Sequence, residues 1–188
     1  MFAEAEVLYL DMRYDEAITL LKQHLIRNPK DAGAHFYLGT CYLNSPKNGW
    51  LGIAQGELQT ALALFKEQGK VNPIPRFNNA TYFEMICHIN LAKVYLRLIV
   101  NVLDLPQNQL GVDRGSAIEK LVEGLEEQYA AAREIAPNDP DVKALYERIS
   151  EVKGLLRYRP RSNPSRPDNN VSRTTFVRPS LATHRKAA

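Results

Sequence analysis

Residues 35–42 read His-Phe-Tyr-Leu-Gly-Thr-Cys-Tyr, and residues 88–95 read His-Ile-Asn-Leu-Ala-Lys-Val-Tyr. The two stretches share a His, a Leu, a small residue and a Tyr at identical spacing. Steps of three, one and three residues place these four side chains on one face of an α-helix. A weaker copy stands at the start of the chain: Met1, Glu4, Ala5 and Leu8. The pattern predicts a repeated helix whose small residue, Gly39 or Ala92, lets a second helix approach closely.

A second pattern follows each copy and ends in a proline. The prolines are Pro29, Pro73 and Pro137. A large side chain stands eight residues before each of them (Leu21, Phe65 and Tyr129), and a further apolar residue stands four residues earlier (Ala17, Ala61 and Leu125). Proline disfavours helix in the residue before it, so each proline marks the end of a second helix.

Together the two patterns resemble the tetratricopeptide repeat (TPR), a helix–turn–helix unit with a Trp-x2-Leu-Gly-x2-Tyr, Ala-x3-Phe and Pro signature. Here Met1, His35 and His88 occupy the Trp position, and the prolines are 44 and 64 residues apart instead of the regular 34. The resemblance implies a right-handed TPR-like α-solenoid. Its three helix pairs would span about 1–30, 31–74 and 78–137, the last two carrying lengthened helices and loops.

Helical periodicity gives the same map independently. It predicts long helices over about 50–69, after a loop at 45–49, and over Thr81–Leu103. Ser116-x-x-Glu119 reads as the capping box that opens the next helix. Asp139 and Pro140 predict the start of a final helix, which would cap the solenoid over 138–156. The prediction is therefore an all-α chain of about seven helices.

The first helix begins almost at Met1 without a capping residue. Solenoid ends need covering, so this helix is expected to fray or to meet another subunit or further chain. A homo-oligomer formed through the N-terminal helix is one such arrangement.

The charges are unevenly distributed along the 188 residues. The net charge is +3, but residues 157–188 carry eight basic side chains against the single acid Asp168. This segment is therefore near +7 and the preceding chain near −4, which favours an interaction tail. The tail is rich in Pro, Ser, Asn and Arg, so it is expected to be disordered alone or ordered by a partner. Its weakly alternating segment 171–177 suits addition to the edge of a partner's sheet.

The chain offers no constellation typical of an enzyme, a metal site or a cofactor site. Cys41 and Cys87 lie inside apolar helical patterns and predict buried, reduced thiols. His35 and His88 occupy packing positions and have no His or Cys partner at metal-helix spacing. The glycines of segment 110–116 have the wrong spacing for a phosphate loop. We therefore expect a protein without catalytic activity, metal or cofactor.

No segment has the features of a signal peptide, and no apolar run is free of charge over about 18 residues, the length that a membrane span needs. The most apolar run, residues 91–105, contains Lys93, Arg97 and Asp104. The expected location is cytoplasmic, with peripheral membrane association left open.

In the TPR family, partners bind an inner groove lined by the first helix of each repeat. The resemblance implies these groove residues: Phe2, Glu6, Tyr9, Phe36, Tyr37, Thr40, Leu43, Ile89, Asn90, Lys93 and Arg97. Such a mainly apolar and aromatic set suits an amphipathic helix or an extended peptide. The Lys/Arg/Asn clamp of chaperone-binding members is missing, because Phe2, Glu6, Tyr37, Ile86 and Asn90 stand at the matching places. A groove filled by an inserted loop or by the tail is the alternative.

The predicted function is a non-catalytic scaffold, adaptor or assembly factor that binds protein subunits of a larger complex. The tail would supply a second contact through basic and aromatic residues: Arg157, Arg159, Arg161, Arg166, Arg173, Phe176, Arg178, Arg185 and Lys186. The alternative is a nucleic-acid-associated or ribosome-associated helical protein that uses the same tail, since eight basic residues can also meet phosphates or anionic lipid. Against nucleic acid, the tail has only Tyr158 and Phe176 for stacking, and the rest of the chain is acidic.

Overall fold

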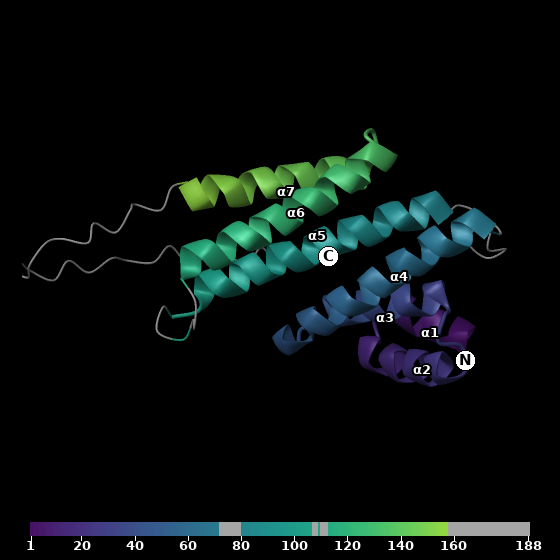
Figure 1. Ribbon diagram of the computed structural model, residues 1–188. Helices are drawn as coiled ribbons and strands as arrows, with labels where there is room; N and C mark the ends of the chain where they lie inside the picture. The colour runs from purple at the N-terminus through teal and green to yellow at the C-terminus, as the bar shows by residue number, and fades with distance from the viewer. Residues whose placement is uncertain (72–79, 107–108, 110–112, 158–188) are drawn as a thin grey trace, which may run out of the picture. The chain divides into compact units, whose positions relative to one another are not determined.

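The computed structural model of the protein describes residues 1–71, 80–106, 109 and 113–157. These residues form seven α-helices and one 3-10 turn, with no strand among them (Figure 1). The elements are α1 (Phe2–Leu10), α2 (Tyr14–Arg27), α3 (Ala32–Asn44), the 3-10 turn η1 (Asn48–Trp50), α4 (Leu51–Val71), α5 (Ala80–Asp104), α6 (Arg114–Ile135) and α7 (Pro140–Arg157). The predicted all-α fold is confirmed. The predicted tail falls outside the described residues except for Arg157, which ends α7.

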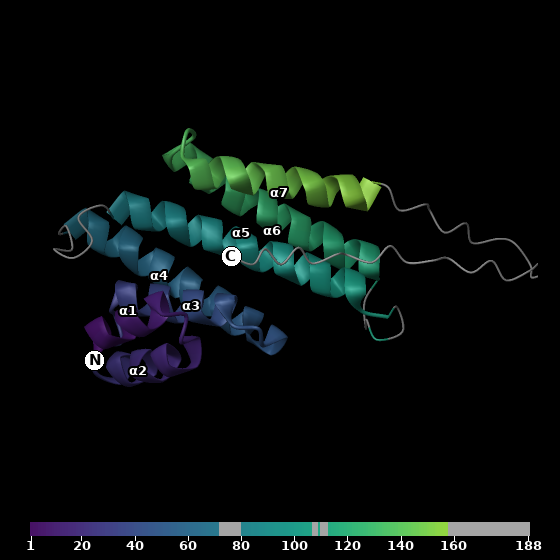
Figure 2. The same ribbon diagram turned by 180° about the vertical axis from the view of Figure 1, so that it is seen from behind.

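Helices α1 to α6 pack mainly against the helices before and after them in the chain, and α7 packs about equally against α5 and α6 (Figures 1 and 2). The most extensive contacts join α5 with α6 and α3 with α4. A second set of contacts joins helices one step further apart: α1 with α3, α3 with α5, and α5 with α7. The odd-numbered helices therefore form a row of neighbours of their own.

The first turn is closed by backbone hydrogen bonds at the end of α1. The amide of Arg13 donates to the carbonyl of Leu8, and the amide of Met12 donates to that of Tyr9. This is the hydrogen-bond pattern of a Schellman motif, whose C′ residue adopts a left-handed conformation. Met12 fills that position with φ 60° instead of a glycine. The three-residue link returns the chain at once, so α2 packs along α1.

Gly39 marks the closest approach of α3 and α4. A Cβ atom at this position would lie 2.8 Å from Cγ of Leu58, 3.1 Å from its backbone nitrogen and 3.2 Å from the carbonyl oxygen of Ala54. Two of these three atoms belong to the backbone of α4, which cannot move aside as a side chain can. The expected close contact at Gly39 is present, and Ala5 and Ala92, its counterparts in the pattern, are also fully buried.

The core has two parts, and α5 contributes to both. Cys87, Leu91 and Val94 of α5 pack with the side chains of α1–α4. Met85, Ala92 and Ile99 are among the α5 residues that pack with α6 and α7. A helix buried on more than one face must be apolar around most of its circumference. This explains why α5 contains most of the long apolar run 91–105.

His35 and His88 each connect the helix that carries them with the next helix along the chain. His35 Nδ1 lies 2.6 Å from the carboxylate of Glu57 on α4, and His88 Nδ1 lies 2.8 Å from Oε1 of Gln128 on α6. When α4 and α6 are aligned on these two hydrogen bonds, Ala132 of α6 corresponds to Ala61 of α4, because each lies one helical turn after the bonded residue. The spacing of the prolines instead makes Leu125 correspond to Ala61, and Leu125 lies two helical turns before Ala132. The contact of α6 with α5 is thus displaced by two helical turns from the alignment of α4 with α6 that the proline spacing predicts.

The predicted long helices agree with α4 and α5 to within a residue or two, and Asp139 caps α7 by accepting from the amide of Asp141 at 2.8 Å. Two details differ from prediction. The loop predicted at 45–49 continues into the turn η1, and α6 begins at Arg114. Asp113, not Ser116, is its N-cap, and its side chain accepts from the amide of Ser116 at 2.9 Å. Asp113 binds a free backbone amide in the first turn of α6, so the helix begins about one turn before the start predicted from Ser116.

Candidate protein-binding groove

Most of the residues predicted to line the inner groove lie inside the protein. Six of them are buried: Phe2, Phe36, Thr40, Leu43, Ile89 and Asn90. Glu6, Tyr9, Tyr37 and Arg97 are half-buried, and Lys93 is exposed. The six buried residues are packing residues in this structure and offer little surface to a partner.

Contacts within the row of odd-numbered helices account for this burial. Phe2 and Tyr9 of α1 place their rings edge-on against Tyr37 of α3, with ring centroids 5.8 and 5.2 Å away. Further along the row, Phe36 packs edge-on against Phe83. The sequence pattern identified the face correctly as apolar, but a pattern does not say which neighbour covers a face.

The α3–α5 contact continues through polar groups. The amide nitrogen of Asn90 donates to the hydroxyl of Thr40 at 3.3 Å, and Thr40 donates to the carbonyl of Phe36 at 2.8 Å. Arg97 donates to the carbonyl of Leu43 and, at 3.5 Å, to that of Ser45. These carbonyls belong to the end of α3, where backbone acceptors lack helical partners. Arg97 therefore ties α5 to the C-terminal end of α3.

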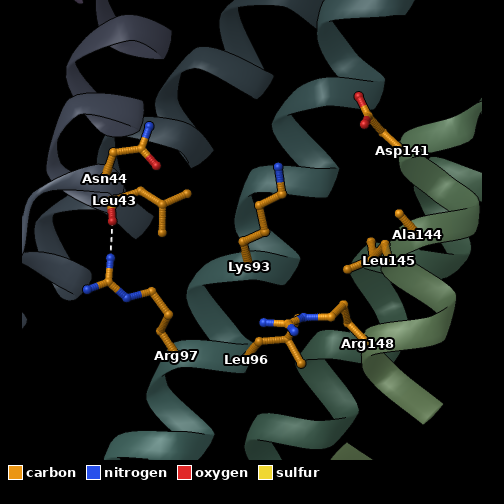
Figure 3. Close-up of a pocket in the computed structure, with 9 residues that line it drawn as sticks. All are labelled: Leu43, Asn44, Lys93, Leu96, Arg97, Asp141, Ala144, Leu145 and Arg148. Carbon is orange, nitrogen blue, oxygen red and sulfur yellow. Dashed lines mark hydrogen bonds between the residues drawn. The ribbon is translucent and has the colours of Figure 1, made fainter. Parts of the chain in front are cut away.

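An open groove remains where α3, α5 and α7 meet (Figure 3). The part beside the start of α7, drawn in Figure 3 and called the upper part below, has a volume of about 430 Å³. The residues that line it are Leu43, Asn44, Lys93, Leu96, Arg97, Asp141, Ala144, Leu145 and Arg148. A lower part of about 320 Å³ continues between α5 and α7 and shares Leu96, Arg97 and Arg148 with the upper part. We call the two parts together the α5–α7 groove.

The α5–α7 groove has an apolar floor. Leu43 and Leu145 are buried, and Leu96 and Val152 are half-buried. At the lower end, Val100 and Leu155 keep 47% and 67% of their surface exposed. Side chains of this size gain about 1.5–3 kcal/mol each when they are buried. The lower end therefore presents apolar surface that a partner can cover.

Three cations stand over this floor. In Figure 3, Lys93 and Arg97 extend from α5, and Arg148 extends from α7 toward Leu96. Arg97 is held by the end of α3, and Arg148 lies 3.7 Å from Glu151 of its own helix in a mainly exposed ion pair. Lys93 has no ion pair within the described part of the chain. Asp141 stands at the upper rim in Figure 3.

The sequence pattern indicates Lys93, Arg97 and Leu43 but not the wall formed by α7. For residues 138–156 it predicts only a cap over the C-terminal edge of the solenoid. The signal was present, since α7 carries Leu145 and Val152 along one stripe, but that stripe alone does not say that part of it faces α5. The predicted cap does bury Val142, Leu145 and Ile149.

Burial raises the pKa of the two cysteine thiols, and a hydrogen bond raises the pKa of one histidine. Desolvation raises the pKa of Cys41 and of Cys87 to about 12, and both are free and buried, as predicted. The hydrogen bond with Glu57 raises the pKa of His35. Its Nε2 faces the carbonyl of Pro29 at 2.9 Å, so both ring nitrogens meet acceptors and the protonated ring satisfies both. Desolvation lowers the pKa of His88.

Within the described ranges, no three His, Cys, Asp or Glu side chains are arranged to hold a metal ion. The side chains that line the α5–α7 groove are apolar or charged, apart from the amides of Asn44 and Asn101.

Helix α5 bears on the predicted location of the protein, and the exposed side of α1 bears on the predicted oligomer. By length and composition alone, Thr81–Asp104 is apolar enough to cross a membrane, and 44% of its most apolar 18-residue stretch is buried in the fold. Helix α1 exposes Val7 and Leu10, and Met12 follows them. Oligomerisation through this edge stays a prediction.

Comparison of the chain with protein-family models, with curated proteins and with solved structures returned no match. We therefore infer function from the residues and geometry of the chain itself.

Proposed function

We propose that this protein is a non-catalytic scaffold or assembly factor that holds a segment of another protein in the α5–α7 groove. The observation that carries the proposal is an elongated groove with an apolar floor, exposed Val100 and Leu155, and cations along its length. A groove of this kind fits the helix-in-groove mode of recognition, in which apolar side chains anchor and charges orient the ligand. The basic tail supplies a second contact with the same assembly.

The proposed architecture is a TPR-like right-handed α-solenoid. It is supported by the sequential packing of the helices, by the row of odd-numbered helices, and by the buried small residues Ala5, Gly39 and Ala92. In such a solenoid the first helices of the pairs line the concave face. The α5–α7 groove lies along this row, toward its C-terminal end.

Co-purification with three chains tests this proposal. The full chain, the variant Ala144→Trp and a chain ending at Leu156 are used as baits in native extract at low and high salt. Ala144 is exposed in the groove, so a Trp side chain blocks the upper part without entering the core. We expect a defined protein set on the full chain and on the truncated chain, and its loss from Ala144→Trp. Apolar burial responds little to salt.

Two results would contradict the proposal. Retention of the same proteins by Ala144→Trp would place recognition outside the α5–α7 groove. Recovery of nucleic acid with the full chain alone, with an affinity that falls steeply as salt rises, would favour the tail acting on phosphates.

A further inference from the structure

The charges around the α5–α7 groove suggest which kind of protein segment it accepts. Within the groove the cations Lys93, Arg97 and Arg148 outnumber the acids Asp141 and Glu151. Arg97 and Arg148 lie where the two parts of the groove meet, Lys93 lines the upper part only, and Asp141 stands at the rim. A ligand that lies along the groove therefore passes between positive side chains.

Not all of these charges are available to a ligand. The guanidinium of Arg97 is occupied by the carbonyls of Leu43 and Ser45. Lys93 is exposed and has no ion pair among the described residues, and Arg148 has only a surface pair with Glu151. Exposed ion pairs of this kind contribute little to stability. Lys93 from α5 and Arg148 from α7 are thus the two cations whose hydrogen-bond donors can meet carboxylates from opposite walls, and Arg97 keeps its positive charge beside them because the carbonyls that it binds are neutral.

The apolar surface of the groove has helical spacing on both walls. Leu96 and Val100 are four residues apart on α5, and Leu145, Val152 and Leu155 follow one another along α7. The lining runs from Asp141 to Leu155, about four helical turns or 20 Å. Two neighbouring helices present a furrow into which the side-chain ridge of a third helix packs.

We infer that the α5–α7 groove binds an acidic amphipathic helix of about four turns. Its apolar stripe packs on Leu96, Val100 and Val152, and carboxylates flanking that stripe pair with Lys93 and Arg148. This inference rests on the proposed function and names the class of partner for the same groove. Complementary charges chiefly set specificity and association rate, so a basic helix with the same stripe is rejected.

A displayed peptide library provides the test. The probes are peptides of about four helical turns with Leu at helical i, i+4, i+7 and i+11 spacing. Glu, Gln or Lys is allowed at random at the positions flanking the stripe. The library is selected on the immobilised full chain, on Lys93→Glu/Arg148→Glu, and on the control Lys120→Glu/Lys143→Glu. The control changes the net charge by the same amount at exposed positions outside the groove.

The full chain and the control are expected to enrich Glu over Lys by about tenfold, equivalent to about 1.4 kcal/mol, and the groove variant is expected to reverse the preference. Binding should be lost on Ala144→Trp. Peptides that need an open groove but show no preference for Glu, or prefer Lys, overturn the acidic-helix inference and leave the proposed function standing. Absence of any enrichment sensitive to Ala144→Trp also overturns the inference, and the co-purification experiment then decides the proposed function separately.

Discussion

Gly39 is the residue at which the packing of α3 on α4 can be tested with a single methyl group. A Cβ at this position meets Leu58 and the carbonyl of Ala54 within 3.2 Å. We expect Gly39→Ala to lower the free energy of unfolding by about 1–3 kcal/mol and Gly39→Leu to lower it further, because overpacking forces the helices apart. Chemical denaturation followed by circular dichroism measures both.

Gly56 provides the matched control for this prediction. It lies within α4, and a Cβ there would meet no atom within 4 Å. Gly56→Ala should raise the free energy of unfolding by about 0.5–1 kcal/mol, because alanine favours the helix. Equal stabilisation by alanine at both glycines would refute the close approach at Gly39.

His35 connects stability with pH through its carboxylate partner. Its pKa is raised by Glu57, so this pair stabilises the fold fully below the unfolded histidine pKa of about 6.5, and the contribution is lost as pH rises through the folded value. His88 acts in the opposite direction, because its lowered pKa destabilises the fold as pH falls below that of the unfolded chain. The wild-type profile combines both effects.

Glu57→Gln isolates the first effect. The difference in unfolding free energy between the wild type and Glu57→Gln should be larger near pH 6 than near pH 8. Denaturation of both proteins at the two pH values measures it, with Glu119→Gln, an exposed change on α6, as the control. A difference that does not change with pH would mean that His35 and Glu57 do not form a charged pair.

At the scale of single residues, the sequence predicted burial better than it predicted contact. It identified Gly39, Ala61, Cys41 and Cys87 as interior positions, and all four are buried. It did not indicate that His35 and His88 bridge to Glu57 and Gln128, since a cross-helix hydrogen bond depends on how two helices are shifted along each other. Repeats of unequal length leave that shift open.

The helices themselves follow from local signals, and the start of α6 shows where such signals compete. Asp113 and Ser116 are both good capping residues, and the side chain of Asp113 accepts from the amide of Ser116. Asp113→Ala should destabilise the protein by about 0.5–2 kcal/mol. Ser116→Ala should have little effect, because Ser116 lies inside the helix. Thermal denaturation distinguishes them, and a larger loss at Ser116 would restore the capping box predicted from the sequence.

Helix α7 shows what periodicity leaves undetermined. Its apolar stripe predicts one buried face, and Val142, Leu145 and Ile149 confirm it. The stripe is wide enough to touch both α5 and α6, and the contact with α5 creates the groove. Whether a last helix merely covers an end or also forms the wall of a site depends on its tilt, which no local pattern encodes.

Over the whole molecule, the central question is whether recognition occurs in the α5–α7 groove or in the basic tail. The described helices supply a shaped surface with an apolar floor, whereas residues 158–188 supply six net positive charges. Apolar contact gives affinity that persists in salt, and charge alone gives affinity that salt removes. The account assigns recognition to the groove and accessory attraction to the tail.

Site-specific photocrosslinking tests this assignment most directly. A photoreactive amino acid is placed at Ala144, inside the α5–α7 groove, or at Ala130, an exposed position on α6. We predict that the same partner protein is crosslinked from Ala144 with both the full chain and a chain ending at Leu156, and that Ala130 gives no such product. Crosslinking from Ala144 that disappears with the tail, or equal crosslinking from Ala130, would contradict the assignment of recognition to the groove.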